Sequence, residues 1–271
     1  MSRLAVLPDG CRLVYDDHGT GPAVLLVHGW GTSRLVWQGQ TRELAAGHRV
    51  VAVDWRGCGD SDHPATGNCV RQVAEDLARL VELLDLAPVI AVGSSLGGNA
   101  VLDLAVHHPQ LLRAAVLVDA PQHHFADGLP EGAFDAWLAT LSERRPEVLD
   151  RMVAGWFGPG GGAALRAWTL QLLLRSGWWI DDTLRSAQQH DLRSLLPSCT
   201  VPVALVHGAH DGEVPISVSR QTAELLPHGG LHVLPDAGHM PALDDPVAFN
   251  RLLLGLIQQW GASTPIPGGP A

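Results

Sequence analysis

The chain has 271 residues, of which 46% are hydrophobic and 17% are charged, and its formal net charge is −10. This apolar content predicts a globular fold with a large core and excludes an intrinsically disordered chain. All 18 basic residues are arginine and they form no basic stripe, so we expect no nucleic-acid partner.

Neither export nor a membrane span is indicated. No uncharged apolar run is long enough to cross a bilayer, and the apolar stretch in residues 1–10 is interrupted by Pro8 and Asp9, so it is too short for a secretory signal. We therefore expect a cytoplasmic protein. The cysteines show neither a CxxC pair nor the spacing of a zinc site and are expected to be reduced thiols. They are Cys11, Cys58, Cys69 and Cys199.

Short apolar runs bounded by glycine or proline recur along the chain and predict strands. They are Arg12–Tyr15, Ala23–Val27, Val50–Val53, Val89–Val92, Ala114–Val118, Val201–Val206 and Leu231–Leu234. Helical patterns lie between several of these runs. They are Arg34–Ala46, Val70–Leu86, Asn99–His107, Ser217–Leu226 and Pro246–Trp260. Because strands alternate with helices, we expect an α/β fold with a mostly parallel, doubly wound sheet covered on both faces.

The alternation stops between residues 121 and 197, where helical stretches without a strand pattern hold five of the nine tryptophans. A glycine-rich run at residues 158–162 divides this interval. We expect residues 121–197 to form a helical cap over one end of the sheet, inserted into a core made by residues 1–120 and 198–260. The proline- and glycine-rich residues 261–271 predict a flexible tail.

A GxSxG motif, from Gly93 to Gly97, follows a predicted strand and precedes a helical pattern. In this setting the motif forms a sharp strand-to-helix turn, which the two glycines permit because a larger side chain would collide with neighbouring backbone. We expect Ser95 to lie above the sheet edge as a nucleophile. The N–H of Leu96, at a helix N-terminus, can then face a developing oxyanion.

A serine hydroxyl needs a base, and the base needs an orienting acid. Asp211 follows the predicted strand Val201–Val206, and His239 follows Leu231–Leu234. Ser95, Asp211 and His239 therefore each lie just past the C-terminal end of a predicted strand. A parallel sheet places such residues at one edge, so we expect them to meet.

The order Ser95, Asp211, His239 makes the chain resemble the α/β-hydrolase fold family over roughly residues 10–260. The resemblance implies about eight strands, with a helical cap inserted after the sixth. The run His28-Gly29-Trp30-Gly31 resembles the family's oxyanion loop, which implies that the N–H of Trp30 is a second oxyanion donor beside that of Leu96. The run from Asp54 to Ser61 resembles a DxRGxGxS turn, which we interpret as structural.

Within the family, the run from His28 to Gly31, the pair Val36-Trp37 and the run from Ser95 to Gly98 look most like small carboxylesterases, such as the methyl ester esterases acting on pimeloyl carrier protein. Arginines of the predicted cap could bind a carrier's phosphate. Nine acidic residues share the cap, so we favour a solvated surface of mixed charge over a carrier site. These arginines are Arg144, Arg145, Arg151 and Arg166.

Several related chemistries fit the residues less well. Haloalkane dehalogenases and epoxide hydrolases use an aspartate nucleophile where this chain has Ser95, and epoxide hydrolases also use cap tyrosines, whereas the only tyrosine is Tyr15. Cofactor-free perhydrolases resemble the chain at its HGW run but usually have proline where Gly31 stands. Perhydrolysis is therefore expected at most as a side activity.

Two alternatives to an esterase stay open. Cofactor-free dioxygenases and related lyases use a histidine–aspartate pair as base without acylating serine, and their acid follows the sixth strand, where Asp119 stands. Asp119 is thus the alternative acid, although the Gly-x-x-Asp-x-x-x-Pro setting favours Asp211. A non-enzymatic small-molecule receptor with this fold is the third interpretation, but a receptor has no need of an intact triad.

The tryptophans of the predicted cap either form its own core or line an acyl pocket, and we expect some to do each. They are Trp137, Trp156, Trp168, Trp178 and Trp179. Few polar anchors are identifiable, so we expect a small hydrophobic substrate. The pairs His107-His108 and His123-His124 have no carboxylate or cysteine at ligand spacing, so no metal is expected.

The sequence thus predicts a cofactor-free serine hydrolase that cleaves a carboxylic ester, thioester or lactone. Ser95 would attack the carbonyl after His239 removes its proton, with Asp211 holding the imidazole. The N–H groups of Trp30 and Leu96 would stabilise the tetrahedral oxyanion.

Overall fold

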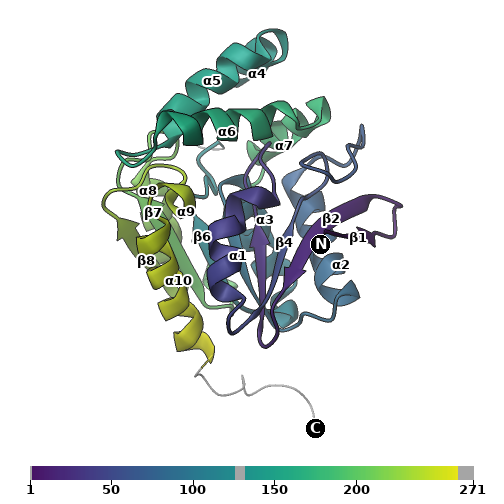
Figure 1. The fold of residues 1–271 in the computed structure, drawn as a ribbon, viewed down its shortest axis with the longest axis vertical. Helices are drawn as coiled ribbons and strands as arrows, with labels where there is room; N and C mark the ends of the chain where they lie inside the picture. The colour runs from purple at the N-terminus through teal and green to yellow at the C-terminus, as the bar shows by residue number, and fades with distance from the viewer. Residues whose placement is uncertain (1, 126–131, 262–271) are drawn as a thin grey trace.

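The computed structural model describes residues 2–125 and 132–261. One eight-stranded sheet runs through the molecule in the order β1-β2-β4-β3-β5-β6-β7-β8 (Figure 1). The strands are β1 Arg3–Val6, β2 Arg12–His18, β3 Ala23–Val27, β4 Arg49–Val53, β5 Val89–Ser94, β6 Leu112–Val118, β7 Val203–Gly208 and β8 Gly229–Leu234. β1 and β2 are antiparallel to their neighbours, and all other pairs are parallel. The expected mostly parallel α/β sheet of about eight strands is confirmed.

All seven strands expected from apolar runs are present, and β1 is an additional one. β1 lies at the sheet edge, pairs only with β2, and leaves Leu4 and Val6 more than half exposed. An edge strand buries little apolar surface and therefore carries a weak hydrophobic pattern. By contrast, β5 is buried at all six positions.

The α-helices are α1 Gln38–Leu44, α2 Val70–Leu83, α3 Leu96–His107, α4 Ala133–Glu143, α5 Arg145–Trp156, α6 Ala163–Leu174, α7 Asp181–Ala187, α8 Ile216–Leu225, α9 Pro241–Asp244 and α10 Pro246–Gly261. Short 3-10 helices span Arg34–Trp37, Pro109–Leu111, Trp178–Ile180 and Leu196–Ser198. The helix expected over Arg34–Ala46 is two elements, because the chain leaves helical geometry at Trp37 (φ −95°, ψ 9°). In the part of the chain that is described, no helix combines the length and apolar character needed to span a bilayer.

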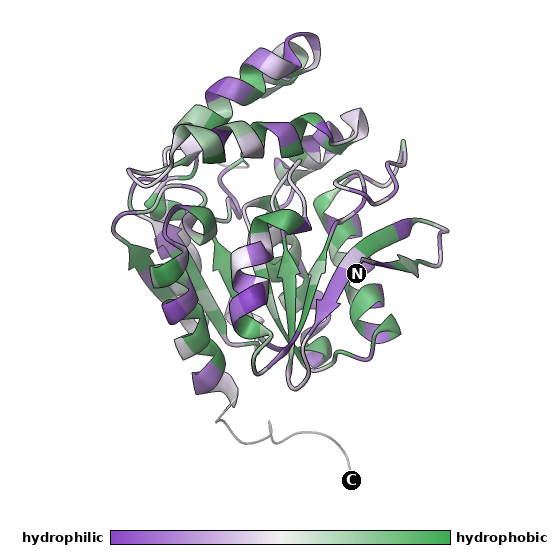
Figure 2. Ribbon diagram, in the orientation of Figure 1, coloured by the Kyte–Doolittle hydropathy of each residue, from purple (hydrophilic) through white to green (hydrophobic). Residues whose placement is uncertain are grey.

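The segment between β6 and β7 is helical, as expected. Its helices α4 to α7, which we term the insertion, lie beyond the carboxyl ends of the parallel strands, with the α4–α5 pair projecting outward (Figure 1). Its boundaries as a separate cap domain remain a prediction. Hydrophobic residues concentrate in the sheet and on the helix faces packed against it (Figure 2). Of the tail expected at residues 261–271, Gly261 ends α10, and the rest lies outside the described residues.

Candidate active site

Ser95 stands on a strained turn between β5, which ends at Ser94, and α3, which begins at Leu96. Its backbone has φ 51° and ψ −126°, a conformation that costs a non-glycine residue about 1–3 kcal/mol. The flanking glycines have no space for a side chain. A Cβ at Gly97 would lie 2.2 Å from the carbonyl oxygen of His28, and one at Gly93 would lie 2.4 Å from the carbonyl oxygen of Gly97. The turn therefore requires the glycines that the motif supplies.

His239 joins Ser95 and Asp211 in one chain of hydrogen bonds. The Ser95 hydroxyl donates to Nε2 of His239 at 3.1 Å, and Nδ1 of His239 donates to Oδ2 of Asp211 at 2.9 Å. The other carboxylate oxygen of Asp211 accepts the N–H groups of Glu213 and Val214 at 2.8 and 3.0 Å. Both oxygens are thus committed, which fixes the carboxylate and, through it, the imidazole.

The His239 loop is also anchored from the insertion. Oδ2 of Asp244 accepts the N–H of Gly238 at 2.7 Å and that of Gly158, which follows α5, at 2.9 Å. The indole ring of Trp156, the last residue of α5, lies against the imidazole with ring centres 5.6 Å apart. His239 is therefore held by its own loop and by a helix of the insertion.

Asp211 and His239 shift each other's pKa in opposite directions. Burial alone would lower the pKa of His239, but the charge and hydrogen bond of Asp211 outweigh it, and the pKa lies above the ordinary histidine value. Burial would likewise raise the pKa of Asp211, but His239 and the two amide donors lower it instead. Each group thus stabilises the charged form of the other.

Asp119, the alternative acid, lies close by but makes no hydrogen bond with His239. Its Oδ1 accepts the N–H of Gly208 at 2.8 Å, while its Oδ2 is buried without a partner. Burial and the charge of Asp211 raise the pKa of Asp119 well above its usual range, which favours a neutral carboxyl group. The hydrogen bond to the imidazole is therefore made by Asp211 and not by Asp119.

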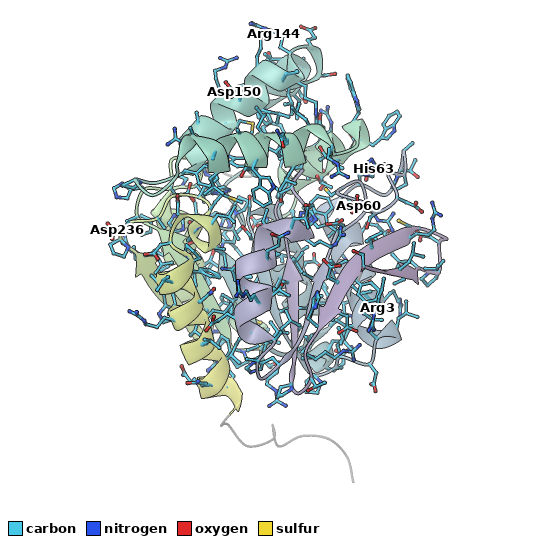
Figure 3. The ribbon with its side chains drawn as sticks, in the orientation of Figure 1. Arg3, Asp60, His63, Arg144, Asp150 and Asp236 are labelled. Carbon is cyan, nitrogen blue, oxygen red and sulfur yellow. The ribbon has the colours of Figure 1, made fainter. Side chains whose placement is uncertain are left out.

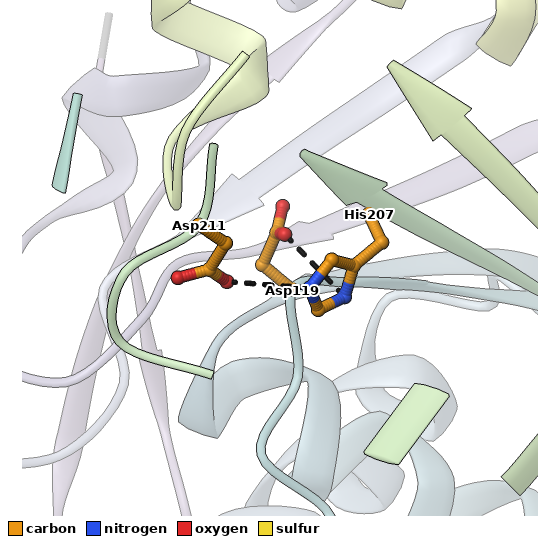
Figure 4. A group of neighbouring side chains, drawn as sticks. All are labelled: Asp119, His207 and Asp211. Carbon is orange, nitrogen blue, oxygen red and sulfur yellow. Dashed lines mark ion pairs between the residues drawn. The ribbon is translucent and has the colours of Figure 1, made fainter. Parts of the chain in front are cut away.

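His207 faces both Asp119 and Asp211, with nitrogen–oxygen distances of 3.6 and 3.7 Å (Figure 4). Ligating atoms of the three residues all lie within 4.8 Å of one another. Both ring nitrogens of His207 are already engaged within the protein. Nε2 of His207 donates to the carbonyl of Val214 at 3.1 Å, and Nδ1 accepts from the hydroxyl of Ser219 at 3.0 Å. Burial also lowers the pKa of His207, so the ring is neutral. His207 therefore supports the loop that holds Asp211, by binding the carbonyl of Val214.

The two residues expected to supply the oxyanion donors line the same cavity as Ser95. Among the described residues, the backbone N–H groups of Trp30 and Leu96 have no acceptor, and both residues line the cavity above Ser95. The loop that carries Trp30 runs close to the nucleophile, because a Cβ at Gly29 would lie 3.0 Å from that of Ser95. Burial lowers the pKa of His28, at the start of this loop, to about 4, so this ring is neutral at physiological pH.

His28 anchors the loop, and one of its contacts needs a neutral ring, because Nε2 accepts the backbone N–H of Trp55 at 3.4 Å. Its Nδ1 donates to the carbonyl of Gly29 at 2.7 Å, and its ring stacks on Trp55 with centres 5.4 Å apart. The indole N–H of Trp55 in turn donates to the His28 carbonyl at 2.9 Å. The DxRGxGxS run, which contains Trp55, therefore supports the oxyanion loop.

A cavity opens over Ser95. Most of its lining is apolar or aromatic, which is typical of small-molecule sites. Its lining residues are Gly29, Trp30, Thr32, Ser95, Leu96, Pro121, Phe125, Met152, Trp156, Leu184, Glu213, Val214, His239 and Met240. Besides His239, Glu213 is the one titratable side chain among them.

Of the five tryptophans proposed for the pocket, Trp156 lines this cavity. The other four do not line it within the described part of the chain, so the structure does not place them in the pocket as predicted. Trp178 and Trp179 are 67% and 53% exposed, and Trp137 packs on Phe134 with ring centres 5.6 Å apart. Trp168 is partly buried against the core. The tryptophan content predicts an aromatic-rich insertion, but it does not indicate which face of each helix packs over Ser95.

Sequence reasoning missed several pocket residues because they carry no motif. Phe125 precedes α4, Met152 lies on α5 and Leu184 lies on α7, and all three resemble ordinary core residues. Glu213 gave a usable signal, since it lies two residues after Asp211 on a loop already expected at the site.

The four arginines assigned to a solvated cap surface differ among themselves. Arg144 fits that description: it lies at the outer tip of the insertion and pairs with Glu147 (Figure 3). Arg145 does not, because it is buried and pairs with Asp181 at 2.7 Å. The hydrophobic contacts of α5 carry it inward, where Asp181 offsets the cost of burying its charge.

Comparison with known proteins identifies the family. The family model for the alpha/beta hydrolase fold matches residues 22–246. A non-heme chloroperoxidase from Streptomyces lividans is 31% identical, with 92% of this chain and 97% of the relative covered. A pimeloyl-[acyl-carrier protein] methyl ester esterase from Vibrio atlanticus is also 31% identical, with 91% and 98% covered.

Among solved structures, an esterase from Exiguobacterium antarcticum superimposes with a TM-score of 0.89 at 26% identity, covering 95% of this chain and all of that one. Family match, relatives and structure agree over nearly the whole chain. The protein therefore belongs to the alpha/beta hydrolase fold family, and it is a hydrolase.

Proposed function

We propose that this hydrolase cleaves a carboxylic ester, thioester or lactone of a small hydrophobic substrate through an acyl-enzyme on Ser95. The observation that carries the proposal is the continuous chain of hydrogen bonds from the Ser95 hydroxyl through His239 to Asp211, at the floor of an apolar cavity. Nucleophile and base lie within hydrogen-bond reach, and a third group orients the base, which is the arrangement that activates a serine.

In the first half of the reaction, Ser95 Oγ attacks the carbonyl carbon while His239 Nε2 takes the hydroxyl proton. The carbonyl oxygen becomes an oxyanion that the N–H groups of Trp30 and Leu96 stabilise. The carbon–oxygen or carbon–sulfur bond then breaks, and His239 returns the proton to the leaving group. In the second half, water replaces serine as the nucleophile. The carboxylic acid product is released and the Ser95 hydroxyl is regenerated.

Two features favour this chemistry over the alternatives. In the dioxygenase or lyase alternative, Asp119 would be the acid that orients His239. However, Asp119 makes no hydrogen bond with His239, and its raised pKa favours the uncharged form. Perhydrolases usually have proline at the position of Gly31. Here Gly31 has φ +68°, and proline is restricted to φ near about −65°, so this loop is not in a conformation proline could adopt.

A free small molecule fits the structure better than an acyl group on a carrier protein. Arg145 is committed to Asp181 and Arg144 to Glu147, so two of the four arginines considered for a carrier's phosphate are already paired. The relative named for pimeloyl-carrier esters shows that such substrates occur in the family.

Labelling with a fluorophosphonate probe tests the nucleophile. We expect a covalent adduct on Ser95 by peptide mass spectrometry, loss of labelling in Ser95→Ala, and turnover of short-chain nitrophenyl esters by the wild type. Ser95→Ala and His239→Ala should each lower kcat by about 10⁴ to 10⁶-fold, and the double variant should be little worse, because the two residues act as a unit. A Ser95→Ala enzyme that keeps a tenth of wild-type turnover would exclude the acyl-enzyme.

A further inference from the structure

Glu213 places a carboxylate in the lining of an otherwise apolar cavity. Its Oε2 accepts the indole N–H of Trp156 at 3.3 Å, and among the described residues no donor is bonded to its Oε1. No arginine pairs with this side chain in the part of the chain that is described. A carboxylate in such surroundings has lost part of its hydration without gaining a counter-charge.

The position of Glu213 brings this negative charge close to the reacting groups. Its backbone N–H binds Asp211, and Trp156, which its side chain contacts, lies against the imidazole of His239. The carboxylate also contributes to raising the pKa of His239. Its field therefore reaches the place where the substrate carbonyl must sit.

We propose that Glu213 and Trp156 form a cation subsite that makes the enzyme prefer esters carrying an ammonium group over neutral esters of the same shape. This inference rests on the proposed esterase function and names the class of substrate. An ammonium group would supply the counter-charge that Glu213 lacks. Aromatic faces also attract such cations, and Phe125 lines the same cavity as Trp156.

The competing role for Glu213 is purely structural: it holds the Trp156 indole through one hydrogen bond. Glu213→Gln separates the two roles, because its amide oxygen can still accept that bond while the charge is gone. The matched control is Glu224→Gln, the same change at an exposed position of α8 outside the cavity lining.

The experiment compares kcat/KM for pairs of esters that differ only by a nitrogen cation or a carbon atom. Butyrylcholine and 3,3-dimethylbutyl butyrate place the difference in the alcohol. Ethyl 4-(trimethylammonio)butanoate and ethyl 5,5-dimethylhexanoate place it in the acyl group. The neutral ester of each pair reports every general effect of a substitution, including any change at His239, so the ratio within a pair isolates the charge.

In at least one pair, we expect the wild type to favour the cationic ester and Glu213→Gln to lower the cationic-to-neutral ratio about tenfold, with no change in Glu224→Gln. A fall of threefold or more supports the subsite. Ratios that change less than threefold in both pairs, or that change equally in the control, overturn it. Failure of the esterase proposal looks different, because no ester would then be hydrolysed and no probe would label Ser95.

Discussion

The guanidinium carbon of Arg145 lies 5.5 Å from the ring centre of Trp30, so a cation of the insertion covers a residue that lines the cavity over Ser95. The same indole donates its N–H to the carbonyl of Ile180 at 3.2 Å. Arg145 is itself fixed by two hydrogen bonds from one nitrogen to Asp181. Residues of the segment between β6 and β7 therefore hold the Trp30 side chain in place.

We expect Arg145→Leu to lower kcat about tenfold while KM for a small ester changes less than twofold. Removing a whole oxyanion donor costs about 10²- to 10³-fold, and Arg145 only positions Trp30, so its loss should cost less. The matched control is Arg144→Leu, the neighbouring exposed arginine, which should behave like the wild type. Steady-state kinetics on folded protein, checked by thermal melting, measure the effect. Equal kcat values for the two variants would show that Arg145 is only structural.

The acid partner can be identified by two isosteric substitutions. Asp211→Asn should lower kcat about 10⁴-fold without unfolding the protein, because asparagine supports the wrong imidazole tautomer. Asp119→Asn should lose less than tenfold, since that carboxyl group makes no hydrogen bond with His239. The opposite ranking would make Asp119 the acid and favour chemistry without an acyl-enzyme.

The acid limb of activity should lie above the ordinary histidine range. Catalysis needs neutral His239, and Asp211 raises the pKa of that imidazole, so activity should fall as pH drops through a midpoint above about 6.5. NMR titration of the His239 ring in Ser95→Ala should give the same midpoint. Adding Asp211→Asn removes the negative charge and should move it downward. A midpoint that does not respond to Asp211→Asn would contradict this coupling.

Acidification should weaken the fold through His28. Its pKa is lowered from 6.5 to about 4 by burial, so between these values the unfolded chain binds the proton more readily and stability falls as pH falls. The difference in pKa corresponds to about 3 kcal/mol across this window. Urea unfolding at pH 7 and pH 4.5 should show a smaller pH-dependent loss in His28→Asn than in the wild type. Exposed His228 provides the control, and His228→Asn should leave the loss unchanged.

Tryptophan substitutions should separate pocket from surface. Trp156→Phe removes the indole N–H that binds Glu213 and part of the surface against His239, so we expect kcat/KM for a bulky ester to fall at least fivefold more than for an acetate ester. Trp178→Phe, at an exposed position, should leave both unchanged. If both variants respond alike to ester size, Trp156 does not contact the substrate.

The fold and the Ser95–His239–Asp211 chain were predictable because each has a local signature. Apolar runs predict buried strands such as β5. Gly93 and Gly97 indicate a turn with no space for a larger side chain at these two positions. Each of the three functional side chains follows a strand, and parallel strands bring their carboxyl ends to one edge. The sheet topology therefore brings together three side chains that are far apart in the sequence.

The pocket was less predictable because it depends on how the insertion is placed. Trp156 and Trp178 look alike in the sequence, but one lies against His239 and the other is exposed. Arg144 and Arg145 are adjacent, yet only the second turns inward to Asp181 and Trp30. Such differences are set by long-range packing between helices, which leaves no periodic trace.

The distance of 144 residues between Ser95 and His239 along the chain has a consequence during synthesis. A ribosome adding about 5–20 residues per second makes Ser95 roughly 7 to 29 seconds before it makes the base. Throughout that interval the nascent protein carries a serine without the imidazole that activates it. Chains truncated before His239 should therefore be unable to attack cellular esters, however much of the sheet they have formed.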